Sequence, residues 1–239
     1  MGYVLSAEGL VKEYKGFRAL DGLSIHVPRG AIYGLVGKNG AGKTTLIRIL
    51  CALQEPTAGE YALFGVDSRD RAVTRVRRRV GAVVEGPAVY QELTGQETLH
   101  IQYQVLGRKD FDTIPVLLEW VGLGNTGKKK VKNFSLGMRQ RLGIAVALAG
   151  EPELLILDEP VNGLDPQGII EMRKLLLKLN REKGVTILIS SHILDELSRL
   201  ATHYGFIDSG RMVEEVAAAC VDESLEQHYM KLIGGNWDA

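Results

Sequence analysis

The most constraining feature of this chain is a glycine-rich segment, Gly37–Thr44, which reads GKNGAGKT. It matches GxxxxGK[ST] in full and follows Ile32–Val36, an apolar run typical of a buried strand. Gly37, Gly40 and Gly42 let the backbone wrap around a chain of phosphates where a Cβ would collide. A glycine-rich turn without a ligand is the alternative, but the lysine and threonine favour a phosphate-binding strand–loop–helix.

Two side chains at the end of this loop have expected roles. Lys43 is expected to reach the β- and γ-phosphates of a nucleotide, and the Thr44 hydroxyl is expected to hold Mg²⁺. The backbone amides of the loop and of the helix start would point at the same anion. The predicted nucleotide-binding residues are Gly37, Lys38, Asn39, Gly40, Ala41, Gly42, Lys43, Thr44 and Thr45.

A second element of the site follows the apolar run Leu154–Leu157. Ligands of open α/β sheets bind at the carboxyl ends of strands, so Asp158 is expected to hold Mg²⁺ through a water. Glu159, the next residue, is placed to polarise an attacking water as a general base. An acidic turn without a catalytic role is the alternative, and the presence of the glycine-rich loop argues against it.

The order of the predicted elements indicates an α/β fold. Apolar runs such as VTILIS are nearly continuous, as in strands covered on both faces of a mostly parallel sheet. The predicted strands are Ile25–Val27, Ile32–Val36, Gly81–Val84, Leu154–Leu157, Thr186–Ser190 and Tyr204–Ile207. The predicted helices are Thr44–Leu53, Leu93–Leu106, Thr113–Val121, Met138–Ala149, Pro166–Glu182, Leu194–Ala201 and an amphipathic tail helix, Asp222–Ile233. The basic run Arg69–Arg79 is expected to form a surface helix with one buried edge at Val73, Val76 and Val80.

Composition excludes some classes of function. The 239 residues carry 29 Lys and Arg against 29 Asp and Glu, a formal net charge of zero, whereas nonspecific nucleic-acid binding favours a basic domain. No apolar run reaches the roughly 18 residues that a membrane span requires, so the chain is not expected to cross a membrane by itself. Its two cysteines are too few for a disulfide framework, and a reducing cytosol is expected.

Four further segments occur in a characteristic order. They are Tyr14, Phe134–Arg141 (FSLGMRQR), Asn162–Asp165 (NGLD) and Ser190–His192 (SSH). Together with the glycine-rich loop they resemble the ATP-binding subunits of ABC transporters, and the resemblance covers nearly the whole chain. It implies a P-loop NTPase core with a mostly parallel sheet, an antiparallel β subdomain and an inserted helical subdomain. A P-loop kinase would leave FSLGM and SSH unexplained.

The resemblance also implies a domain division. One ATP-binding domain would span 1–239, with the core and β subdomain at about 1–85 and 150–215. The helical subdomain would occupy about 86–149, and a C-terminal helix about 216–239.

The resemblance assigns further residue roles. The signature of one subunit faces the P-loop of a second, so Ser135 and Gly137, with Asp165 of the D-loop, would bind the partner's ATP. His192 would hydrogen-bond the γ-phosphate and orient the water with Glu159. Lys43 would stabilise charge during hydrolysis. Tyr14 would stack on adenine, with Phe17 as a nearby competitor. 

Partners follow from the same resemblance. The expected ones are a second ATPase subunit, in an ATP-dependent homodimer, and an integral membrane permease, with no nucleic acid. The chain would then lie peripherally on the cytoplasmic side of a bacterial cell membrane. A soluble ABC ATPase acting on ribosomes or DNA remains an alternative.

Two departures from the family pattern indicate a particular subgroup of the family. Leu136 and Met138 stand in the signature where glycine and glutamine are common, and Glu85 stands where the family usually has a glutamine that contacts Mg²⁺. A carboxylate keeps the oxygens but loses the amide donor, so Glu85 is a predicted ligand of the Mg²⁺–nucleotide. The glutamate and the SLGM signature resemble the subgroup that exports lantibiotics and bacitracin-like peptides and protects the cell against them. A generic multidrug exporter ATPase is the alternative.

Overall fold

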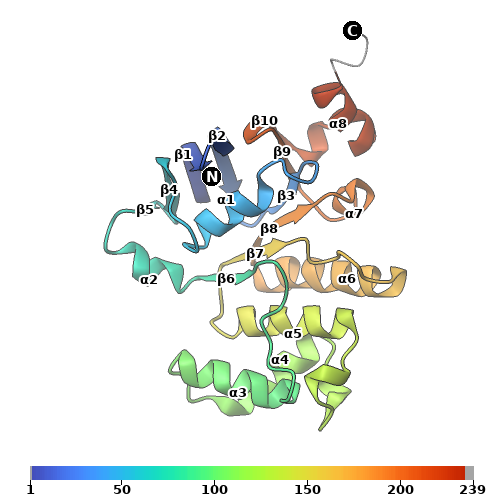
Figure 1. The fold of residues 1–239 in the computed structure, drawn as a ribbon. Helices are drawn as coiled ribbons and strands as arrows, with labels where there is room; N and C mark the ends of the chain where they lie inside the picture. The colour runs from blue at the N-terminus through green and yellow to red at the C-terminus, as the bar shows by residue number, and fades with distance from the viewer. Residues whose placement is uncertain (1, 235–239) are drawn as a thin grey trace. The chain divides into compact units, whose positions relative to one another are not determined.

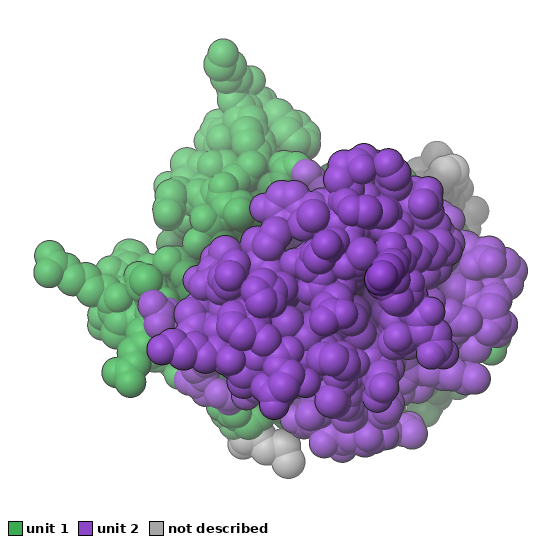
Figure 2. All heavy atoms as spheres, turned by 90° about the horizontal axis from the view of Figure 1, so that it is seen from below, with its two compact units in different colours: residues 1–77, 186–239 green, residues 78–185 purple. Residues whose placement is uncertain are grey.

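The computed structural model describes residues 2–234 and divides into two compact units. The first unit comprises Met1–Arg77 with Thr186–Ala239, and the second comprises Arg78–Val185 (Figure 2). Among the described residues, no helix combines the length and apolar character needed to span a membrane. The division into core, helical subdomain and C-terminal helix stays a prediction.

An antiparallel sheet of four strands forms part of the first unit (Figure 1). Its spatial order is β2-β1-β4-β5, and the strands are β1 (Tyr3–Tyr14), β2 (Phe17–Pro28), β4 (Ala58–Leu63) and β5 (Val66–Asp67). The register between β1 and β2 shifts at several points, one of them between Ala7 and Leu10. These β-bulges disturb the strict alternation of buried and exposed side chains along β1.

A second, mostly parallel set of strands in the same unit carries the glycine-rich loop. β3 (Ile32–Val36) pairs in parallel with both β8 (Thr186–Ser191) and β9 (His203–Asp208). β10 (Arg211–Ala217) joins the other side of β9 in antiparallel orientation. Every residue of β3 and β8 is buried, which agrees with the continuous apolar runs of the sequence.

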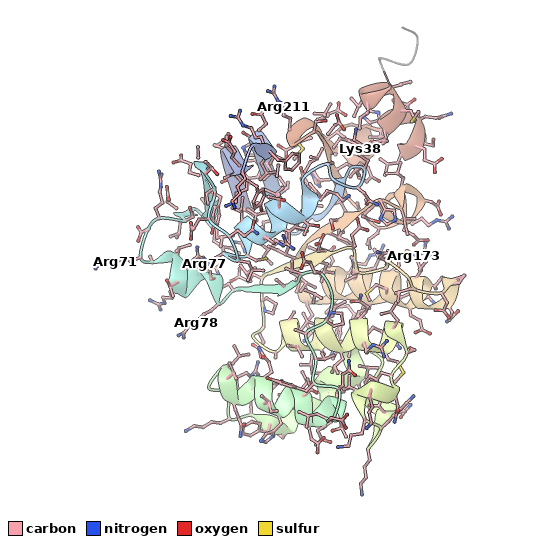
Figure 3. All side chains as sticks on the ribbon, viewed as in Figure 1. Lys38, Arg71, Arg77, Arg78, Arg173 and Arg211 are labelled. Carbon is pink, nitrogen blue, oxygen red and sulfur yellow. The ribbon has the colours of Figure 1, made fainter. Side chains whose placement is uncertain are left out.

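Short helices complete the first unit. They are α1 (Lys43–Leu50), α2 (Val73–Arg77), α7 (Leu194–Ser198) and α8 (Leu225–Ile233). The expectation of one helix along the basic run was wrong. α2 covers only five residues, with Val73 as its buried residue, and Val80 begins a strand instead (Figure 3 labels Arg71 and Arg77 in this segment). Helical spacing of valines cannot distinguish a continued helix from a turn that leads into a strand.

The second unit pairs two parallel strands with four helices (Figure 1). The strands are β6 (Val80–Val83) and β7 (Leu154–Asp158), and all of β7 is buried. The helices are α3 (Gly95–Val105), α4 (Ile114–Trp120), α5 (Leu136–Leu148) and α6 (Pro166–Lys183). Thr94 and Glu97 form a capping box at the start of α3, which explains why that helix begins there. The observed elements form the α/β fold that the sequence predicts.

Candidate nucleotide-binding and catalytic site

The glycine-rich loop joins the end of β3 to the start of α1. Gly40 and Gly42 have φ values of +82° and +112°, in the left-handed region that favours glycine. A Cβ on Gly37 would lie 2.5 Å from the carbonyl oxygen of Ile207, and one on Gly42 would lie 2.8 Å from that of Ala19. The loop is therefore pressed against backbone on its inner side. A Cβ on Gly40 would meet nothing within 4 Å, so this part of the loop is open.

Lys43 is held inside the curve of this loop. Its side chain is buried, and its Nζ donates to the carbonyl oxygen of Gly37 at 2.6 Å and to that of Lys38 at 3.3 Å. The loop thus gathers a positive charge at the N-terminus of α1, where the helix dipole already favours anions. The remaining predicted residues line the same turn. Asn39 and Gly40 are exposed, Ala41 is buried, and Thr44 and Thr45 are half-buried in the first turn of α1.

The turn between β9 and β10 supports the loop from behind. The Gly210 amide donates to the carbonyl oxygen of Ala41 at 2.9 Å, and the Lys38 ammonium pairs with Asp208 at 2.9 Å. This hydrogen-bonded pair raises the pKa of Lys38 and lowers that of Asp208. Sequence reasoning missed Asp208 and Gly210, because no motif marks them and they lie far from the loop along the chain.

The histidine after β8 emerges beside the glycine-rich loop. β3 and β8 are parallel neighbours, and their last paired residues are Val36 and Ser191. Gly37 and His192 each follow directly, so they leave the sheet at the same edge. His192 is exposed there.

Three predicted carboxylates gather at one edge of the second unit. Asp158 is the last residue of β7 and is buried, with 6% of its surface exposed. Val83 and Leu157 are paired across β6 and β7, and Glu85 and Glu159 each lie two residues further on. Both glutamates adopt positive φ values, +59° and +49° respectively. The two strands therefore deliver them in equivalent backbone positions at the same edge.

The signature serine and the D-loop aspartate are both helix caps. The Ser135 Oγ accepts the amide of Met138 at 3.2 Å at the start of α5. The Asp165 Oδ1 accepts the amide of Gly168 at 2.9 Å at the start of α6, where Pro166 takes the first helical position.

These two helix starts lie close together within the second unit. A Cβ on Gly163 would lie 3.2 Å from Leu136 Cδ2, and one on Gly137 would lie 3.7 Å from Leu164 Cδ2. Gly137 is half-buried, and Leu136 is 37% exposed. The positive ends of two helix dipoles therefore adjoin, which suits an incoming anion.

Tyr14 ends β1 and remains accessible, with 37% of its surface exposed. Its hydroxyl donates to Gln54 Oε1 at 2.5 Å, and the Lys12 Nζ lies 5.3 Å from the ring centroid. Phe17, paired with Tyr14 across the hairpin, is 61% exposed. Both aromatic rings thus have exposed surface, and the Lys12 ammonium lies over the ring of Tyr14.

The predicted Mg²⁺ ligands, Thr44, Asp158 and Glu85, suit the ion only when a nucleotide supplies further oxygens. No group of three or more His, Cys, Asp or Glu within residues 2–234 could hold a metal by itself. Mg²⁺ usually keeps several waters and binds through one or two protein oxygens plus the phosphates of a substrate. The Thr44 hydroxyl in the first unit and the Asp158 carboxylate in the second unit are each an oxygen donor of this kind.

Comparison with known proteins identifies the family. A family model described as "ABC transporter" matches residues 20–162. The chain is 47% identical over 216 residues to the bacitracin transport ATP-binding protein BcrA of Bacillus licheniformis, covering 90% of this chain and 70% of BcrA. It is 42% identical over 212 residues to the lantibiotic transport ATP-binding protein SrtF of Streptococcus pyogenes, covering 89% and 90% of the two chains. 

The fold has a solved counterpart in cbiO1 of Clostridium perfringens, part of the ABC transporter complex cbiONQ. The TM-score is 0.82 at 27% identity, covering 98% of this chain and 93% of that one. The chain therefore belongs to the ATP-binding subunits of ABC transporters, and it is an ATP hydrolase of the kind that drives transport. Such cassettes work as dimers and with membrane permease components.

Proposed function

We propose that this chain powers a permease that exports peptide antibiotics of the bacitracin or lantibiotic type, or protects the cell against them. The observation that carries the proposal is the similarity of about nine tenths of the chain to the bacitracin and lantibiotic transport ATP-binding proteins. Glu85 and the SLGM signature support it.

Within one subunit, we assign the predicted residues to a single hydrolytic site. The P-loop amides and the Lys43 ammonium would bind the phosphates of ATP, and Thr44 and Asp158 would hold Mg²⁺, which neutralises phosphate charge when bound. Glu159 would accept the proton of the attacking water, and His192 would orient that water. Glu85 would offer a further oxygen from the neighbouring strand end.

A second copy of the chain would complete each site. The paired helix starts at Ser135 and Asp165, with the amide of Gly137, present partial positive charge toward an anion. They would face the γ-phosphate of ATP on the partner's P-loop. The support for this arrangement is the exposure of Ser135 and Leu136 beside the D-loop.

The permease would dock on the second unit shortly after Glu85. A hollow of about 390 Å³ is lined by Ala88, Val89, Tyr90, Thr98, Ile101, Gln102, Val105 and Val146. Tyr90 is 60% exposed and Val105 is 75% exposed, and such adjoining apolar surface is typical of protein interaction sites. A short helix of the permease would fill this hollow, placing the chain peripherally on the cytoplasmic side of the membrane.

The substrate proposal can be tested by expressing the chain with its permease in a sensitive host. Growth should continue at higher concentrations of bacitracin or a lantibiotic with the wild-type pair and not with a Lys43→Ala pair. Lys109→Ala, which changes an exposed lysine outside the site, is the matched control. Protection only against a small cytotoxic drug would favour the generic exporter, and co-purification with ribosomes or DNA would overturn transport.

A further inference from the structure

The C-terminal helix makes a direct contact with the glycine-rich loop. The backbone amide of Lys38 donates to the Tyr229 hydroxyl at 3.1 Å, and Tyr229 lies in the second turn of α8. Both residues belong to the first compact unit, and Figure 3 labels Lys38 on the loop between β3 and α1. The hydrolytic site proposed above does not include Tyr229.

The contact involves one particular peptide group. The peptide that joins Gly37 to Lys38 accepts through its carbonyl oxygen from the Lys43 Nζ at 2.6 Å, and it donates through its amide to Tyr229. One peptide plane is therefore held on one side by the phosphate-binding lysine and on the other by the tyrosine. A hydrogen bond at the amide also polarises the carbonyl, which strengthens its attraction for the ammonium.

The tyrosine is well anchored in its own helix. Ser224 and Gln227 form a capping box at the start of α8, and Leu225 is buried. The Tyr229 ring packs at 6.3 Å, centroid to centroid, from the Phe206 ring of β9. These contacts fix the position of the hydroxyl, so the hydrogen bond to Lys38 joins the loop to a firm support.

We propose that Tyr229 is a positioning residue for ATP binding, acting through the Gly37–Lys38 peptide to hold Lys43 in the loop. The proposal rests on the phosphate-binding role of the loop. Without the hydroxyl, this peptide can rotate, and a smaller fraction of molecules presents Lys43 to the phosphates. A reduced fraction of binding-competent molecules weakens apparent affinity without changing the reaction of those that bind.

The decisive variant is Tyr229→Phe, which keeps the ring and its packing. Loss of one neutral hydrogen bond changes an equilibrium by roughly two- to tenfold. We expect the Kd and KM for ATP to rise by about that factor, with kcat within about twofold of wild type. The unfolding midpoint without nucleotide should stay close to the wild-type value. Tyr3→Phe, at an exposed tyrosine of β1 in the first unit, should change none of these quantities.

Ser224→Ala separates positioning from general loosening of α8. It removes the helix cap and leaves the Tyr229 hydroxyl, so it should raise KM for ATP less than Tyr229→Phe does. Equal effects of the two variants would overturn the proposal, as would an unchanged Kd and KM in Tyr229→Phe. Lys43→Ala tests separately whether the loop binds phosphate, which the proposal for Tyr229 assumes. If that variant retains full ATP affinity, the phosphate-binding assignment itself is wrong.

Discussion

At the residue scale, the two glutamates at the strand ends combine a reactive group with an unusual backbone. Glu85 and Glu159 both have left-handed φ values, which cost an L-residue roughly 1–2 kcal/mol. Such strain persists only where surrounding structure imposes it, and it concentrates at functional sites. The matched positions of the two residues on adjacent strands therefore support the proposal that they act together.

The backbone and side-chain contributions of Glu85 can be separated by two substitutions. Glu85→Gly and Glu85→Ala both remove the carboxylate, and ATPase turnover should fall in both by about tenfold or more. Glu85→Gly should be the more stable of the two by about 0.5–1 kcal/mol, because glycine accepts the positive φ. Denaturant unfolding and phosphate release provide the two measurements.

Ala52→Gly is the control for that comparison. Ala52 has a φ of +56° at the end of α1, so glycine should stabilise the fold there without altering turnover. ATPase rates equal to wild type in Glu85→Gln and Glu85→Ala would show that Glu85 is neutral variation.

Glu159→Gln tests the general base. Turnover should fall by about 10²–10⁴, because an amide cannot accept the proton of the attacking water. ATP affinity should be retained, since the binding residues are unchanged. Phosphate release and equilibrium binding measure the two effects, and Glu119→Gln, at an exposed glutamate of α4, serves as the control. Unchanged turnover in Glu159→Gln would remove Glu159 from this role.

At the scale of elements, a titratable histidine, His228, links α8 to β10. The His228 Nε2 lies 2.6 Å from Glu214 of β10, and its Nδ1 lies 3.2 Å from Glu223, which itself pairs with Lys231. The ring also packs against Phe206 of β9. The hydrogen bond to Glu214, together with that to Glu223, raises the pKa of His228.

This shift sets the direction of a pH effect. A raised pKa in the folded state means that His228 stabilises the fold below its unfolded pKa of about 6.5, and that the contribution disappears as pH rises through the folded value. The free energy of unfolding of His228→Gln should therefore fall below wild type at pH 6, and the gap should narrow as pH rises through the folded pKa. His26 lies between Glu8 and Glu215 in both proteins, so its titration cancels in the difference. A gap independent of pH would contradict this account.

At the scale of the whole molecule, the proposed dimer depends on a serine that also caps a helix. In a Glu159→Gln background, ATP should shift the protein from monomer to dimer in size-exclusion chromatography, and Ser135→Ala should reduce this shift. Loss of an N-cap costs about 1 kcal/mol by itself. Thr94→Ala removes the cap of α3 and provides the matched control, because Thr94 is outside the predicted interface. If both variants lost dimer equally, the loss would be due to reduced helix stability and not to a contact of Ser135 with ATP.

How much the sequence predicts depends on the range of the interactions. The buried runs of β3, β7 and β8 and the caps of α5 and α6 can be identified locally, because burial on both faces and capping leave short patterns. β1 was not predicted, because its bulges interrupt the alternation of buried and exposed side chains that marks a strand. α2 ended earlier than its valine spacing suggested, because β6 takes up Val80.

The sequence by itself determined the chemistry of this protein. The predicted phosphate-binding loop, the two consecutive carboxylates and the signature segment are each a short continuous stretch of the chain, since each relies on backbone geometry within a few residues. Only the tertiary structure decided what holds that chemistry in place. Asp208, Gly210 and Tyr229 meet the loop from positions far along the chain, through single hydrogen bonds and an ion pair that no local pattern encodes. Such contacts exist only once parallel pairing of β3 with β9 has brought these segments together.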